Sequence, residues 1–148
     1  MSNTLVVDSA KAEQKVQPNL LPCKISYNGS VNANSRYWNP EDETDGSKTV
    51  YFRGRKLQGR EVALPNGYSG AVLQKTDRTI VEASQPTNHD EDMSDQEEAP
   101  QQLKIVELVG SFDAITVWDH EALPESAQNP YLKGVEEWIK LSQAIHGQ

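Results

Sequence analysis

The stretch that decides the fold is residues 48–83, which read KTVYFRGRKLQGREVALPNGYSGAVLQKTDRTIVEA. Four runs in it, KTVYFRG, REVALP, SGAVLQK and RTIVEA, are rich in the β-branched and aromatic residues that favour strands. Glycines, a Pro-Asn-Gly triplet and a Thr-Asp pair separate these runs at short intervals, which is typical of a small barrel or sandwich. The sequence therefore predicts a mainly β protein built around a meander.

Strands and one helix are also predicted outside this stretch. In residues 21–28 (LPCKISYN), apolar and polar residues alternate, so Cys23 and Ile25 would share one face of a half-buried strand. Residues 103–118 return to strand character, and Asn129-Pro130 is a favourable helix start because Asn caps well and Pro suits the first turn. The predicted C-terminal amphipathic helix carries these residues broadly on one face: Leu132, Val135, Trp138, Ile139 and Ile145.

Two segments lack an apolar pattern. Residues 1–19 are polar and aperiodic, so we expect a disordered N-terminal tail. Residues 84–100 hold six acidic residues and no Lys or Arg, which predicts a disordered acidic insertion between strands. The remainder, residues 20–148, is short enough to form a single β domain.

The composition limits the possible functions. The 148 residues carry a formal net charge of −8 and the sequence pI is about 4.8, whereas proteins that coat nucleic acid are usually basic because they neutralise phosphates. Only 36% of the residues are hydrophobic, and a domain with so few apolar residues often completes its core with a partner chain, so this option stays open. One cysteine and no long apolar run predict a soluble intracellular protein with no disulfide and no membrane span.

Residues suited to catalysis are scattered along the chain. Many acidic residues fall in the loop-like residues 29–47 or in the acidic insertion, where solvated side chains are the rule. The three histidines are far apart in sequence, and no phosphate-binding glycine motif is present. We therefore predict no catalytic residue, no metal site and no bound cofactor in this chain.

One segment carries a local positive charge. Residues 48–60 contain five basic residues and no acidic residue, with Tyr51 and Phe52 between them. Such a segment could follow a nucleic-acid backbone or bind an acidic partner, and it could equally be a solvated strand face. The candidate nucleic-acid contacts are Arg53, Arg55, Lys56 and Arg60.

Several motifs resemble one family, the non-catalytic C subunits of eukaryotic ribonuclease H2. The main one is FRGR-x-L-x-G-x-EV at residues 52–62, followed by Pro-x-Gly-x-x-Gly at residues 65–70. The Leu-Leu-Pro-Cys run at residues 20–23, the acidic insertion, the strand from Phe112 to Trp118 and the ending from Trp138 to His146 are similar too. Residues 29–47 carry no family signal.

The resemblance implies a place in a heterotrimer. In this family the C subunit is interlaced with the B subunit in a triple β-barrel-like unit. That unit docks on the catalytic A subunit, where Mg ions would be bound. The complex cleaves RNA in RNA/DNA hybrids and cuts 5′ of ribonucleotides embedded in DNA. Expected settings are ribonucleotide excision repair, RNA catabolism and DNA replication in the nucleus, with the cytoplasm as a second compartment, and no homo-oligomer.

The expected role is therefore that of a scaffold whose strands pair with another chain. The expected partner contacts are Cys23, Ile25, Phe52, Leu57, Val62, Val72, Trp118 and Trp138. The alternative is a small nucleic-acid-binding β-barrel module that acts through residues 48–60. An independent hydrolase is the third reading, and metal-dependent activity of the lone chain would support it.

Overall fold

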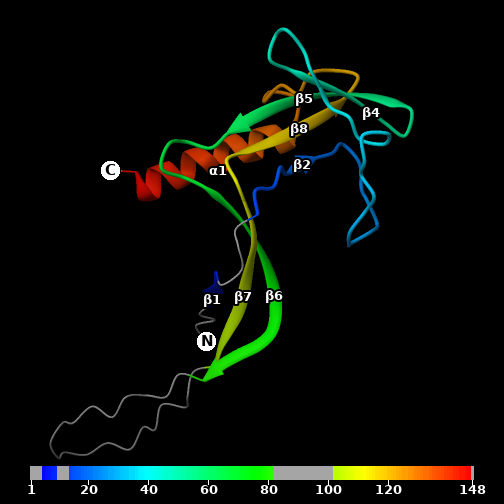
Figure 1. Cartoon of the computed structure of the whole chain (residues 1–148). Coiled ribbons are helices and arrows are strands. Elements are labelled where there is room, and N and C mark those ends of the chain that lie inside the picture. The colour runs from blue at the N-terminus through cyan, green and yellow to red at the C-terminus, as the bar shows by residue number, and fades with distance from the viewer. Residues whose placement is uncertain (1–4, 10–13, 82–101, 148) are drawn as a thin grey trace, which may run out of the picture. The chain divides into compact units, whose positions relative to one another are not determined.

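The computed structural model describes residues 5–9, 14–81 and 102–147, which form eight strands and one helix (Figure 1). The chain divides into two compact units, one made of residues 1–15 and 71–111 and the other of residues 16–70 and 112–148. The predicted acidic insertion at residues 84–100 lies outside the described residues. No described helix is long and apolar enough to cross a membrane.

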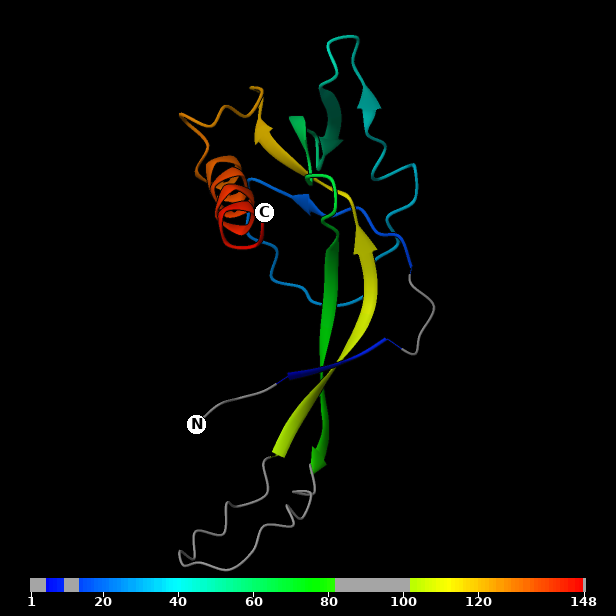
Figure 2. The same ribbon diagram turned by 90° about the vertical axis from the view of Figure 1, so that its left-hand side faces the viewer.

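The unit of residues 16–70 and 112–148 contains a five-stranded sheet in the order β2-β8-β5-β4-β3 (Figures 1 and 2). β5 is antiparallel to both β4 and β8, while β2 is parallel to β8. The strands are β2 (Asn19–Leu20), β3 (Glu41–Asp42), β4 (Lys48–Phe52), β5 (Arg55–Ala63) and β8 (Ala114–His120). The FRGR motif thus lies at the junction of two neighbouring strands.

The turn between β4 and β5 follows directly from that motif. Phe52 pairs with Arg55, so Arg53 and Gly54 are the two turn residues. Their φ angles are 50° and 77°, and a two-residue hairpin turn with positive φ at both positions matches the right-handed twist of the strands. Gly54 adopts this backbone without strain, whereas Arg53 and Glu121 are the non-glycine residues with positive φ in the described part of the chain.

One face of this sheet carries the hydrophobic cluster of the unit. Val50, Leu57 and Trp118 are buried, and Leu21, Trp38 and Phe52 pack against them. The Trp38 ring meets the Trp118 ring edge-on, with 5.4 Å between the ring centres. Gly59 pairs with Trp118 across β5 and β8, and a Cβ atom at Gly59 would lie only 2.7 Å from the Trp118 ring. A glycine is therefore needed at this position.

Helix α1 (Pro130–His146) is attached to β8 at its first turn. The Asn129 side chain accepts hydrogen bonds from the backbone N–H groups of Tyr131 and Leu132, and its Nδ2 donates to Asp119 on β8. This is the helix start that the sequence predicts. Asp119 and Val117 share a face of β8 because side chains alternate along a strand, and Val117 and Leu132 are fully buried.

The unit of residues 1–15 and 71–111 is built on a three-stranded sheet in the order β1-β7-β6. Its strands are β1 (Leu5–Asp8), β6 (Gly70–Val81) and β7 (Gln102–Phe112), and β1 is parallel to β7. Arg78 on β6 forms ion pairs with Asp8 (3.0 Å) and Glu107 (2.6 Å). The Thr76 hydroxyl donates to the backbone oxygen of Ile105 on β7 (2.7 Å).

The fold class predicted from the sequence is confirmed, because the chain is mainly β with a C-terminal helix. The sheets are not closed into a barrel. The runs SGAVLQK and RTIVEA were expected to be separate strands, but they form the single strand β6, so Thr76-Asp77 is not a turn.

Two local expectations also differ from the structure. Residues 21–28 form no strand, and the side chains of Ile25 and Tyr27 are about half or more exposed. Within the predicted tail of residues 1–19, Leu5–Asp8 form β1, and Lys15 makes a bridge to Ser111. Pairing with β7, a contact distant in sequence, orders a stretch whose own pattern gives no strand signal.

Candidate interaction surfaces

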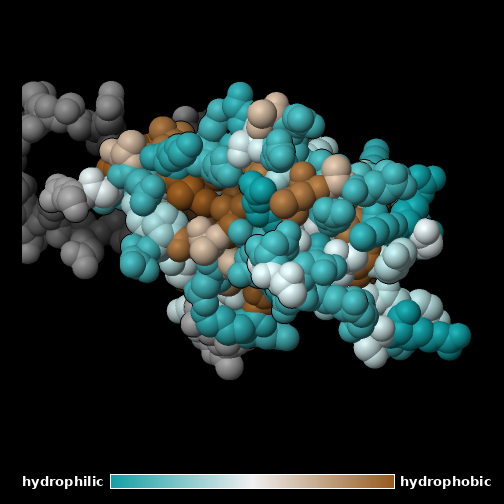
Figure 3. All heavy atoms as spheres, turned by 90° about the horizontal axis from the view of Figure 1, so that it is seen from above, coloured by the Kyte–Doolittle hydropathy of each residue, from teal (hydrophilic) through white to brown (hydrophobic). Residues whose placement is uncertain are grey.

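Several large apolar side chains are exposed on the described part of the chain. On the face drawn in Figure 3, hydrophobic residues are exposed between hydrophilic ones. Within residues 5–9, 14–81 and 102–147, no group of three or more His, Cys, Asp or Glu side chains could hold a metal ion. The exposed apolar side chains are suited to contact with another chain.

The first surface is strand β6. It lies at the edge of its sheet among the described strands, and β7 is its only neighbour there. From Ala71 to Ile80 every residue except Thr76 is exposed, on both faces of the strand. Its large apolar side chains are Val72, Leu73 and Ile80, which are 38%, 47% and 45% exposed. A long edge strand with apolar side chains is a template for pairing with another chain.

The second surface is a hollow of about 510 Å³ beside β2 and the hairpin of β4 and β5. Ile25 lines it together with Tyr27, Val31 and Tyr37, and Phe52 and Trp38 form its floor next to the core. Of the predicted contacts, Ile25 and Phe52 meet here. Val31, which is 65% exposed, was missed because it stands alone among polar residues and gives no periodic signal.

Two of the predicted partner contacts belong to the chain's own core instead. Leu57 and Trp118 are 3% and 1% exposed. The Trp118 indole N–H donates to the side-chain oxygen of Asn19 (2.9 Å), and the Trp38 ring covers it. In this conformation neither side chain can reach a partner, so we no longer expect them to be contacts. Aromatic residues in a sequence do not reveal whether they fill a core or an interface.

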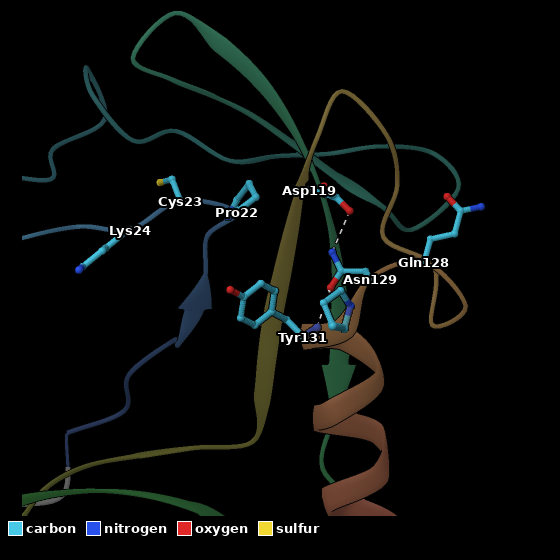
Figure 4. Close-up of a pocket in the computed structure, with 8 residues that line it drawn as sticks. Pro22, Cys23, Lys24, Asp119, Gln128, Asn129 and Tyr131 are labelled. Carbon is cyan, nitrogen blue, oxygen red and sulfur yellow. Dashed lines mark hydrogen bonds between the residues drawn. The ribbon is translucent and has the colours of Figure 1, made fainter.

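The other predicted contacts are spread over the chain. Val72 lies on β6, Val62 is half-buried on β5, and Trp138 is 58% exposed on α1. Cys23 is exposed beside a shallow hollow at the start of α1 (Figure 4). In that close-up the Cys23 side chain points away from Asp119 and Asn129, whose polar groups already bond to each other and to the helix. The side chains of Asp119 and Asn129 are therefore already satisfied within the chain.

The basic residues of the segment 48–60 do not gather on one face. Arg53 occupies the hairpin turn, where its guanidinium lies 5.3 Å from the centre of the Phe52 ring. Arg55 and Lys56 are exposed but point to opposite faces of β5, and Arg60 is half-buried. These four residues form no ion pair with another described residue.

Lys48, the remaining basic residue of that segment, is used within the chain. Its ammonium group bonds to the Asp42 carboxylate and lies 3.5 Å from Glu61. The hydrogen bond from Lys48 to Asp42 is the main reason that the pKa of Lys48 is raised above its ordinary value. Lys48 therefore stabilises the edge strand β3 and is not available to a phosphate.

Comparisons with known proteins agree with one another. Residues 17–145 match the family described as ribonuclease H2 non-catalytic subunit (Ylr154p-like). The ribonuclease H2 C subunit of Bos taurus is 30% identical over 136 residues, covering 87% of this chain and 79% of the relative. Its counterpart of the same description in Mus musculus is 28% identical, covering 87% and 80%. An uncharacterized protein of Schizosaccharomyces pombe is 25% identical over 142 residues, covering 94% and 88%.

Proposed function

Because this chain belongs to the family of ribonuclease H2 non-catalytic subunits, we propose that it folds together with the B subunit of that complex, as a structural support for the catalytic A subunit. Its own contribution is strand pairing and surface burial. The cleavage of RNA in RNA/DNA hybrids, and of DNA 5′ of single ribonucleotides, is the work of the A subunit. Mg ions bound there would assist that cleavage, and this chain would hold no cofactor.

The observation that carries this proposal is the exposed edge strand β6. It is 12 residues long, and from Ala71 to Ile80 every residue except Thr76 is exposed. A strand needs partners on its edge or its faces to be stable in water. A strand of the B subunit that pairs with β6 would supply both, and burying the exposed parts of Val72, Leu73 and Ile80 would contribute roughly 1 kcal/mol for each side chain.

The setting follows from the activity of the complex. Ribonucleotides embedded in DNA arise where DNA is copied, so we propose a role in ribonucleotide excision repair and genome maintenance in the nucleus. The RNA/DNA hybrid would be met only through the complex. The net charge of −8 supports this indirect role, since an acidic chain on its own repels a phosphate backbone.

The proposal is tested by co-expressing this chain with the A and B subunits from the same source. We expect a particle with one copy of each chain on size exclusion with light scattering, and cleavage of a duplex that contains one ribonucleotide. Leu73→Lys places a charge among the apolar groups of β6 and should lower the yield of complex at least tenfold. Gln74→Lys adds the same charge at an exposed polar position of the same strand and should change the yield little.

A wild-type chain that stays monomeric beside soluble A and B subunits would overturn the proposed function. Equal yields from both variants would remove β6 as the pairing site and leave the rest of the proposal standing.

The hairpin between β4 and β5 favours a secondary role in substrate contact for the basic residues that it carries. Arg53 and Arg55 are exposed at its end, and the Arg53 guanidinium is held over Phe52. We propose that within the complex they contact the substrate backbone, whereas Lys56 points to the opposite face of β5. Replacing Arg53 and Arg55 by Ala should raise the KM for the substrate and flatten its salt dependence. An unchanged KM with an intact complex would leave these residues as solvated surface.

A further inference from the structure

Helix α1 has a second apolar face that its own chain does not cover. The side chains that pack inward are Leu132, which is fully buried, and the half-buried Val135, Ile139 and Ser142. The expected single apolar face is therefore wrong, because Trp138 and Ile145 do not join it. They belong to a stripe whose large side chains are more than half exposed, namely Tyr131 (61%), Trp138 (58%), Leu141 (59%) and Ile145 (64%).

The spacing of this stripe is that of a helix that pairs with another helix. Tyr131, Trp138 and Ile145 are seven residues apart, and Gly134 and Leu141 fall between them at alternating steps of three and four. This is the a and d spacing whose side chains fit between those of a second helix. A helix face that packs on a sheet or a globular core is usually wider than this, whereas a stripe confined to a and d positions is typical of a helix that pairs with a second helix. The narrow stripe therefore favours a helix as its occupant.

Gly134 adds a second sign of close approach. It lies in the helix interior, where glycine destabilises a helix by up to about 1 kcal/mol relative to alanine. A Cβ atom at this position would have no heavy atom within 4 Å. The chain's own packing thus gives no reason for a glycine, whereas a partner backbone that crosses α1 at this point does.

A small pocket continues the stripe at its middle. Trp138 forms one wall, and Leu64, Pro65 and Gly70 lie among the other lining residues around about 110 Å³. This volume is several times what one water molecule needs, and its lining is mostly apolar. The Tyr68 hydroxyl donates to the backbone oxygen of Ser142 (3.3 Å), which fixes the loop against α1. The pocket can receive one apolar side chain.

The charges beside the stripe argue against a second copy of this chain. Glu137 follows Gly134 by three residues and precedes Leu141 by four, so it borders the stripe in the position that pairs with a partner's flanking residue. In a second copy of α1, the residues at the positions that could face Glu137 are Val135, Ser142, Glu137 and Ala144. None of these is basic. Glu137 forms an exposed ion pair with Lys133 (3.8 Å), and a partner helix with Lys or Arg at the facing position would be complementary to the same carboxylate.

We propose that this stripe binds an amphipathic helix of another chain of the ribonuclease H2 complex. The partner helix carries apolar residues at a and d spacing and a basic residue opposite Glu137, and one of its apolar side chains enters the pocket beside Trp138. The inference rests on the proposed function, and it names the chemistry of one contact within that assembly.

The test uses the complex co-expressed with the A and B subunits. Leu141→Arg should lower the amount of partner chains that co-purify at least tenfold, because it places a charge in the apolar contact. Gln143→Arg puts the same side chain on an exposed polar part of α1 and should change the yield less than twofold. Hydroxyl-radical labelling of the wild-type complex should oxidise Trp138 at least fivefold more slowly than in the urea-unfolded chains. A photo-crosslinker at Ile145 should join it to a helical segment of one of the two other chains.

The outcomes separate the two proposals. If the wild-type chain forms no complex, the proposed function itself fails. If the wild-type complex forms while Trp138 is labelled as fast as in the unfolded chains and Leu141→Arg co-purifies normally, only the helix-binding inference is overturned. A crosslink from Ile145 to a second copy of this chain would also overturn it.

Discussion

Replacing Gly59 by Ala should destabilise the fold through a single methyl group. Gly59 pairs with Trp118, and a Cβ atom there would lie 2.7 Å and 2.8 Å from two carbons of the indole ring. Carbon atoms in contact are normally about 3.5–4.0 Å apart, so the ring or the strand must move. Trp118 is 1% exposed and is held by Asn19 and Trp38, so it has no free space to move into.

The expected size follows from this lack of space. Overpacking a well-filled core costs about 1–3 kcal/mol, which for a chain of this size lowers the melting temperature by about 2–12 °C. The assay is differential scanning calorimetry of the co-purified complex. Gln143→Ala is the control, since Gln143 is exposed on α1 outside the apolar stripe and a surface substitution there should change the stability by no more than about 0.5 kcal/mol. Only Gly59→Ala should therefore lower the melting temperature clearly.

One result would refute the reasoning. If Gly59→Ala melts within about 1 °C of the wild type, below the shift expected for overpacking, while Gln143→Ala behaves as expected, the indole of Trp118 does not pack on Gly59. The register of β5 against β8, and with it the placement of the core cluster, would then be wrong.

Two further changes test local contacts. Asn129→Ala removes the cap of α1 and leaves Asp119 without its side-chain donor, so the complex should lose about 1–2 kcal/mol of unfolding free energy in urea titration; an unchanged midpoint would contradict the cap. The Ser47 hydroxyl and backbone N–H lower the pKa of Asp45 below its usual 3.8. Any stability that this contributes is present above pH 3.8 and is lost as the pH falls through the lowered pKa. Ser47→Ala should raise this pKa in a carboxyl NMR titration, and no change would exclude the hydroxyl as the main cause.

The sequence predicts the parts of the fold in which local signals and long-range pairing agree. Gly54 lies where the hairpin turn needs a positive φ, and Asn129 caps the helix as expected. The predicted strand from Phe112 to Trp118 is divided at Asp113, where β7 ends and β8 begins. The run from Ala114 to Trp118 is nonetheless mostly apolar because β8 is covered on both faces. In these places the local sequence signal and the structural requirement coincide, so the sequence predicts the element correctly.

The sequence misleads where a segment's partner is distant in sequence or belongs to another chain. Leu5–Asp8 are ordered by pairing with β7, which no local pattern can show. Thr76-Asp77 resembles a turn because β6 has no buried face in this chain to impose an alternation. Trp118 and Trp138 are the same residue type, yet one fills the core and the other is exposed. The sequence alone does not show whether an aromatic residue is buried in the core or exposed for contact with a partner.

The central claim is that this chain completes its fold by pairing β6 with a strand of another chain of the complex. The most direct measurement is the amide hydrogen exchange of residues 71–80 in the assembled complex. We predict slow exchange at consecutive residues along β6, because one half of its N–H groups would bond to β7 and the other half to the partner strand. Fast exchange at every second residue, in a complex that still cleaves a duplex with one ribonucleotide, would show that this edge is open to water and would contradict the claim.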